Sequence, residues 1–127
     1  MAQNDSVGPD TTGTGSTDAE RLDVYRVALE AHGLVTALPL APRRILREQL
    51  ERSSLSIVLN VAEGAGRRSR RDKRRHYAIA QGSAMECAAG LAVVKVRGLA
   101  TDDEIEPVRR LVVRVIQMLS KLDRALA

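Results

Sequence analysis

Aromatic side chains are nearly absent from this chain of 127 residues, which contains two Tyr, no Phe and no Trp. Ala, Leu and Val must therefore fill the interior, and such small aliphatic side chains suit close helix–helix packing better than a β-sandwich core. Apolar residues still make up 44 % of the sequence, which is enough for a single domain with a modest core. We therefore expect an all-α fold.

Cysteine and histidine are also scarce. Cys87 is the only cysteine, so it excludes an intramolecular disulfide and is interpreted as a small core residue in a reducing compartment. Two histidines without a Glu-x-x-His pair argue against a di-iron site, and His32 fits a partly buried, hydrogen-bonded side chain. No signal peptide is recognisable, and the uninterrupted apolar runs fall far short of the roughly 20 residues of a membrane span. The prediction is a soluble cytoplasmic protein without metal, cofactor or membrane partner.

Helical periodicity predicts four helices with short links, arranged as an antiparallel up-down bundle. Residues 1–17 consist largely of Gly, Ser, Thr and Asp and are predicted to form a disordered tail, so that the bundle domain covers 18–127. Capping-box sequences at Thr17–Glu20 and Thr101–Glu104, together with the hydroxyl of Ser69, predict three of the helix starts. The four helices are expected to cover about 17–38, 43–62, 69–97 and 101–126.

Apolar residues define the expected buried face of each helix. On the first helix the predicted stripe is Leu22, Tyr25, Leu29, His32 and Val35. On the last helix, Ile105, Val108, Val112, Val115, Leu119, Leu122 and Leu126 recur at spacings of three and four. Further apolar residues of this helix lie outside that seam, at Leu111, Ile116 and Met118. This excess predicts a second packed surface and therefore a homo-oligomer.

Five glycines are assigned to two roles. Gly64 and Gly66 follow the second predicted helix and are expected to cap it in the left-handed conformation, and Gly98 is expected to close the third helix. Gly82 and Gly90 lie inside the third helix at a cost of about 1 kcal/mol each relative to alanine. We expect another backbone to pack closely against these two positions.

Positive charge is concentrated in one short segment. Seven of the nine residues from Arg67 to Arg75 are basic and only Asp72 is acidic, which gives this segment +6. The whole chain carries +4, so the other 118 residues together carry −2. The basic residues, called the cation cluster below, are Arg67, Arg68, Arg70, Arg71, Lys73, Arg74 and Arg75.

The cation cluster predicts contact with a phosphate backbone. Positive charge at a helix N-terminus opposes the helix dipole, and seven neighbouring cations repel one another. A nucleic acid would compensate both effects through Coulomb attraction and counterion release. Since the segment contains no aromatic residue, we expect it to bind the backbone rather than to recognise sequence. Two alternatives remain open, namely a merely solvated helix start and a site for an acidic protein partner.

Three other polar residues receive structural interpretations. Asn60 and Glu63 lie one turn apart at the end of the second helix, where a carboxylate needs a cation to offset the helix dipole. Arg67 or Arg68 could fold back to supply it and thereby hold the turn. Glu86, on the third helix, is expected to form a hydrogen bond between helices or between subunits.

His76 raises an enzymatic alternative. Arg71-x4-His76 matches the Arg-x(4–6)-His pattern of HEPN ribonucleases, in which the two side chains act on the RNA 2′-hydroxyl and phosphate. Arg70 also satisfies the spacing, because any histidine placed after this arginine run would do so. A metal-independent ribonuclease is therefore an alternative to the non-enzymatic prediction.

Two sequence segments carry a family resemblance: residues 56–69 read Ser-Ile-Val-Leu-Asn-Val-Ala-Glu-Gly-Ala-Gly-Arg-Arg-Ser, and residues 80–86 read Ala-Gln-Gly-Ser-Ala-Met-Glu. They resemble the four helix bundle protein family, also called the 23S rRNA intervening-sequence protein family. The resemblance extends over residues 20–126. At positions 73, 74 and 76, where the family commonly has apolar or aromatic residues, this chain has Lys, Arg and His. The first turns of the third helix are therefore expected to be more solvated here.

The resemblance implies an all-α bundle that assembles as a homo-oligomeric ring, typically a pentamer, and it implies no enzymatic activity. It also implies kinship with the accessory protein of diversity-generating retroelements, a basic pentameric bundle that binds nucleic acid and partners a reverse transcriptase. Within the family motif, Asn60, Glu63, Gly64, Gly66 and Glu86 are the expected structural positions. The expected partners are RNA or DNA, a second copy of the chain and a reverse transcriptase.

Overall fold

The computed structural model describes residues 18–19 and 22–127. This part contains four α-helices and no strands, which confirms the predicted all-α class and the number of helices. The predicted tail, residues 1–17, lies outside the described residues. The helices are α1 (Asp23–Thr36), α2 (Arg44–Gly66), α3 (Arg70–Val96) and α4 (Asp102–Leu126).

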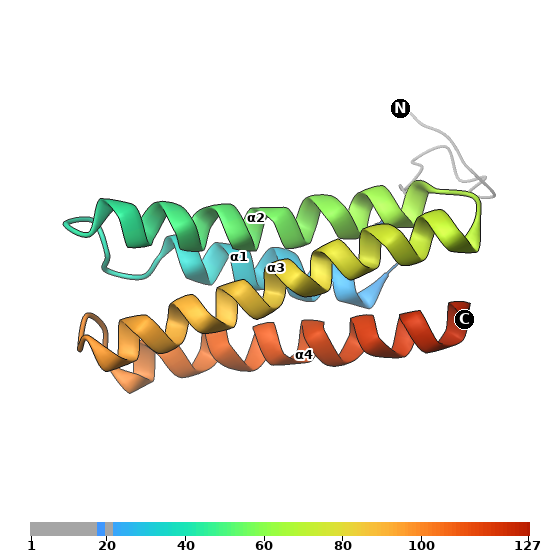
Figure 1. Cartoon of the computed structure of the whole chain (residues 1–127). Coiled ribbons are helices and arrows are strands. Elements are labelled where there is room, and N and C mark those ends of the chain that lie inside the picture. The colour runs from blue at the N-terminus through green and yellow to red at the C-terminus, as the bar shows by residue number, and fades with distance from the viewer. Residues whose placement is uncertain (1–17, 20–21) are drawn as a thin grey trace, which may run out of the picture.

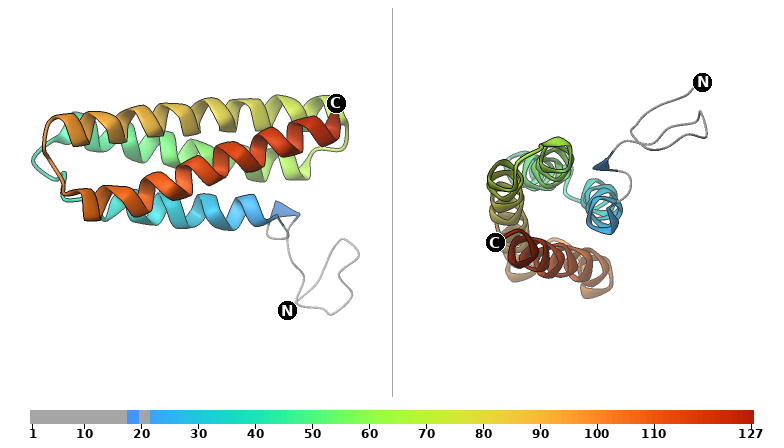
Figure 2. Two further views of the ribbon diagram at one scale, coloured as in Figure 1. Left: turned by 90° about the horizontal axis from the view of Figure 1, so that it is seen from below. Right: turned by 90° about the vertical axis from the view of Figure 1, so that its right-hand side faces the viewer.

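Each helix packs against two others around one core: α1 contacts α2, α2 contacts α3, α3 contacts α4, and α4 contacts α1. Figure 1 shows the α1–α2 and α3–α4 links at one end of the molecule and the α2–α3 link at the other. Figure 2 shows the same arrangement from below and along the helix axes. The core consists mainly of Val, Ala, Leu and Ile, with Tyr77 as its one buried aromatic residue among those described. Small side chains allow the helices to approach closely along their length.

The start of α1 differs from the prediction. α1 begins at Asp23 after an extended Leu22, and no side chain caps it. Thr17 and Glu20, the outer residues of the predicted capping box, lie outside the described residues. The predicted stripe is also partly wrong, because Leu29 is exposed while Ala28 and Ala31 are buried. Alanines face the core here because they allow α1 to approach its neighbours, so the larger leucine is left on the outside.

Gly64 and Gly66 do not form left-handed caps, because α2 continues through both residues. Gly98 is the one glycine with positive φ (65°) among the described residues, which confirms its predicted role after α3. Gly64 instead allows α3 to approach, since a Cβ there would lie 2.7 Å from the ring of Tyr77. A close approach does occur at Gly90, but the neighbour is a side chain and not the predicted backbone, because a Cβ there would lie 2.6 Å from a side-chain carbon of Leu50. At Gly82 the prediction is wrong, because nothing lies within 4 Å.

The starts of α3 and α4 are confirmed. Ser69 caps α3 by accepting a hydrogen bond from the backbone N–H of Asp72, at 3.0 Å. Thr101 and Glu104 form the predicted capping box of α4. Pro107 lies inside α4 without ending it. Both caps join residues three positions apart, so they depend on local sequence alone.

The surplus apolar residues of α4 do not form a free surface. Leu111, Ile116 and Met118 are partly buried against the same core as the main seam, so the reason given for a second packed surface is wrong. Exposed apolar side chains lie instead mainly on the outer faces of α2 and α3. The exposed large ones on these two helices are Ile45, Leu55, Leu59, Ile79, Met85, Val93 and Val96.

One helix in the described part, α3, is long and apolar enough to cross a membrane by length and composition. The short uninterrupted apolar runs of the sequence did not reveal this property. It arises because α3 is apolar on two sides: one side packs in the core and the other is exposed. Core helices meet the same criterion, and α3 packs against both α2 and α4.

Candidate nucleic-acid interface

The cation cluster lies at the end of the molecule where α2 passes into α3. Arg67 ends α2 in an extended conformation, and Ser69 then caps α3, so the chain reverses within a few residues. This brings the last turn of α2 beside the first turns of α3. Six of the seven cations are exposed, and Lys73 is half-buried.

Lys73 has a structural role. Its Nζ donates hydrogen bonds to the carbonyl oxygens of Gly64 and Ala65, at 3.2 and 2.9 Å. These carbonyls belong to the last turn of α2, where helix carbonyls lack intrahelical partners and the dipole is negative. Lys73 thus stabilises the end of α2, although it stands at the unfavourable end of its own helix. The sequence alone did not reveal this, because the contact requires the chain reversal.

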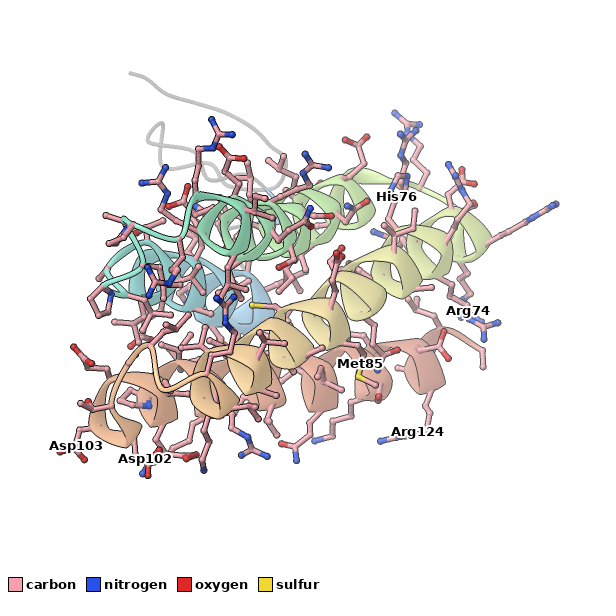
Figure 3. The ribbon with its side chains drawn as sticks, turned by 60° about the vertical axis from the view of Figure 1, so that its left-hand side comes forward. Arg74, His76, Met85, Asp102, Asp103 and Arg124 are labelled. Atoms are coloured by element: carbon pink, nitrogen blue, oxygen red, sulfur yellow. The ribbon has the colours of Figure 1, made fainter. Side chains whose placement is uncertain are left out.

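Arg67 and Arg74 form ion pairs within the chain. Arg67 donates to Glu63 at 2.7 Å, which confirms the predicted fold-back onto that carboxylate. Arg74, labelled in Figure 3, donates to both carboxylate oxygens of Asp123 on α4, at 2.9 and 3.4 Å. The hydrogen bond from Arg74 and the attraction of its charge hold the pKa of Asp123 below its usual value. Both pairs lie on the surface, where water screens them.

Four arginines of the cluster are exposed without a partner. Arg68, Arg70, Arg71 and Arg75 form no hydrogen bond or ion pair with any described residue. Asp72, the one acidic residue of the segment, contributes its backbone N–H to the Ser69 cap. These four guanidinium groups therefore form the part of the cluster that is available to bind a ligand, and we call them the free arginines.

Asn60 and His76 join α2 to α3 beneath the cluster. Asn60 donates to the carbonyl oxygen of Ser56 at 3.0 Å, and its Oδ1 lies 3.4 Å from Nδ1 of His76. His76 is buried, and its Nε2 is enclosed without a hydrogen-bond partner among the described residues. The expectation of a solvated side chain at this position is therefore wrong. Its imidazole faces α2, whereas Arg70 and Arg71 are exposed, so a surface-bound RNA would not reach Nε2 in this conformation.

The remaining candidate residues have ordinary surroundings. His32 is part-buried and hydrogen-bonded to Ser54 at 2.7 Å, as predicted. Cys87 is a buried core residue, as predicted, and burial raises the pKa of its thiol to about 11. Gly66 is the last residue of α2, and Glu86 is exposed on the outer side of α3. Across the described residues, no three His, Cys, Asp or Glu side chains come together as a potential metal site.

These features define an all-α protein whose cation cluster lies where α2 passes into α3. The chain belongs to the 23S rRNA-intervening sequence protein family, whose model matches residues 21–121. This confirms the family resemblance in the sequence.

Comparison with solved structures supports the fold. The chain is similar to the crystal structure of a protein of unknown function from the S23 ribosomal protein family of Bacteroides thetaiotaomicron, with a TM-score of 0.73 and 20 % identity. The similarity covers 79 % of this chain and 97 % of the other. No curated protein matches the chain significantly.

Proposed function

We propose that this protein is a non-enzymatic, homo-oligomeric nucleic-acid-binding protein of the cytoplasm, which holds the backbone of RNA or DNA through its cation cluster. The observation that carries the proposal is the exposure of Arg68, Arg70, Arg71 and Arg75 without acidic partners. A role beside a reverse transcriptase or in a ribonucleoprotein is the natural extension of this proposal.

The physical argument concerns charge that the fold leaves uncompensated. An isolated cation on the surface usually costs the folded state little free energy. Here, however, four guanidinium groups lie within eight residues near the positive end of a helix, and they repel one another. A phosphate backbone would neutralise them and release counterions. Since no aromatic residue lies in the segment, the contact would be insensitive to base sequence.

A binding titration tests the proposal. Native protein would be compared with a variant in which the four free arginines are changed to Gln, using structured RNA and duplex DNA at two salt concentrations. Lys73 is left intact because it caps α2. A charge-matched control changes four exposed cations on α4 to Gln, namely Arg109, Arg110, Arg114 and Lys121.

We expect the first variant to lose binding. In a plot of the logarithm of the binding constant against the logarithm of the salt concentration, its slope should be shallower by about 0.9 for each phosphate contact to duplex DNA that is lost. The α4 control should bind nearly as the native protein does. Equal losses in both variants would contradict a localised site. Binding of an acidic protein but not of nucleic acid, even at low salt, would support the alternative partner.

The assembly that we propose is a ring of antiparallel up-down bundles. Support comes from the apolar outer faces of α2 and α3, which carry Leu55 and Leu59 on one and Ile79, Met85 and Val93 on the other. Neighbouring helices of a four-helix bundle present their outer faces about a quarter turn apart. In a closed ring, the directions from one subunit to its two neighbours form an angle of about 90° when the ring has four copies and about 108° when it has five.

The register of the helices suggests how copies would meet. The Ser56–Ser83 hydrogen bond of 2.7 Å and the contact of Gly90 with Leu50 fix α2 against α3. By this register Arg52 of α2 lies near the level of Glu86 of α3. Glu86 is a charged residue within the exposed apolar face, and in a ring whose axis follows the helices it would meet Arg52 of the neighbouring copy.

Sedimentation or light scattering of charge variants tests this contact. Glu86→Arg and Arg52→Glu should each reduce the subunit number, and the double exchange should restore it. Native mass in both single variants would contradict the proposed contact, and a monomeric native protein would contradict the ring.

A further inference from the structure

A second cationic site lies at the end of the molecule opposite the cation cluster. Arg43, Arg44 and Arg97 line one shallow cavity of about 360 Å³, together with Pro42, Ile45 and Leu46. Arg43 and Arg44 stand at the start of α2, whereas Arg97 follows α3, so the site exists only in the folded chain. We call this cavity the distal arginine cavity.

The positive charge of this cavity is uncompensated. None of the residues that line it is acidic, and its three arginines form no hydrogen bond from the side chain and no ion pair with any described residue. The first turn of α2 contains no acidic residue and no side-chain cap, so the positive end of its dipole adds to the same potential.

Two acidic residues at this end of the molecule are occupied elsewhere. Asp102 lies 3.9 Å from Lys95, and Glu104 is held in the capping box of α4. Figure 3 shows Asp102 and Asp103 at the end of the molecule remote from Arg74. The three guanidinium groups therefore face solvent beside the apolar residues of the cavity. Because no carboxylate of the described residues pairs with them, they are available to bind a phosphate group.

We infer that the distal arginine cavity is a second contact site for the nucleic-acid backbone, so that the protein bridges two nucleic-acid segments at its two ends. The inference rests on the proposed function, because it assigns the same chemistry to both ends. The 23 residues of α2 separate the two sites, which corresponds to roughly 35 Å at 1.5 Å per residue. A phosphate group that is bound at one site cannot also contact the other site. The two sites would therefore bind separate nucleic-acid segments or distant parts of one folded nucleic acid.

A bridging assay tests the inference. Protein is bound to an immobilised duplex, and capture of a second, fluorescent duplex is measured for four forms of the full chain. They are the native chain, the variant with the four free arginines changed to Gln, a cavity variant, and an α4 control. The cavity variant carries Arg43→Gln, Arg44→Gln and Arg97→Gln. The control carries Arg110→Gln, Arg114→Gln and Lys121→Gln, which removes the same charge from another surface.

We expect the native chain and the α4 control to capture the second duplex. The cavity variant should still bind the immobilised duplex through the cation cluster but lose most of the capture at equal occupancy. Circular dichroism and sedimentation of each variant confirm that fold and assembly are intact. Restoration of capture by Lys at the three cavity positions would support a charge contact.

Two outcomes overturn the inference in distinguishable ways. If the cavity variant captures as much second duplex as the native chain does, the distal cavity is not a contact site, while the cation cluster and the proposed function stand. If the native chain binds no duplex or structured RNA at low salt, both the proposed function and this inference fail.

Discussion

Replacing Gly64 by alanine tests the packing that positions the cation cluster. A Cβ at this position would lie 2.7 and 2.9 Å from two ring carbons of Tyr77 and 3.2 Å from Cβ of His76. Tyr77 is only 4 % exposed, so its ring has little room to move. Gly64 also supplies a carbonyl oxygen to Lys73, so the same contact orients the first turns of α3.

The expected size of the effect follows from two opposing contributions. Overpacking of a buried site costs about 1–3 kcal/mol, whereas alanine gains up to about 1 kcal/mol over glycine inside a helix. We therefore expect Gly64→Ala to lower the free energy of unfolding by about 1–2 kcal/mol. Gly33→Ala is the matched control, because Gly33 also lies in the last turns of a helix and has nothing within 4 Å. It should raise stability by about 0.5–1 kcal/mol.

Urea unfolding followed by circular dichroism measures both variants at one fixed subunit concentration, because assembly would make stability concentration-dependent. The decisive quantity is the difference between the two variants, whose expected signs are opposite. If Gly64→Ala is as stable as Gly33→Ala, the close contact between α2 and Tyr77 does not exist in solution. Changes of similar size and sign in both variants would show that helix propensity alone governs these positions.

Four further predictions concern the core and the cluster. Lys73→Met should lower the free energy of unfolding by about 1–2 kcal/mol, because two carbonyl oxygens lose a charged donor, whereas Arg71→Met should leave urea unfolding almost unchanged. The Cys87 thiol should react with a thiol reagent at pH 8 at least about 100-fold more slowly in the native than in the unfolded chain, since its pKa is raised from 9.0 to about 11; rapid labelling of native protein would contradict its burial. That raised pKa also favours the folded state below pH 9, and the contribution should fade as the pH rises from 9 to 11. Asp123→Asn should release Arg74 and so increase affinity for nucleic acid at low salt, and unchanged affinity would place Arg74 outside the interface.

Much of the fold followed from short-range sequence signals. The caps at Ser69 and Thr101 were predictable, because a capping side chain and the N–H that it accepts from are only three residues apart. The buried stripe of α4 was also predictable, since the helical period aligns apolar residues along one face. The family motif in residues 56–69 and 80–86 is likewise a feature of the sequence alone.

Less of the candidate site was predictable. The sequence located the cation cluster but not its division into structural and free members. Lys73 could not be recognised as a cap for α2, and Arg74 could not be assigned to Asp123, 49 positions away in the sequence. The distal arginine cavity was missed for the same reason, because Arg97 meets Arg43 and Arg44 only after the helices have packed.

The sequence by itself thus determined the number of helices, the buried face of α4 and the concentration of charge between Arg67 and Arg75. Tertiary structure decided the role of Gly64, the burial of His76 and the choice of which arginines remain free. The physical reason is range: caps and periodicity act within one or two turns, whereas burial and ion pairing depend on which surfaces the neighbouring helices cover.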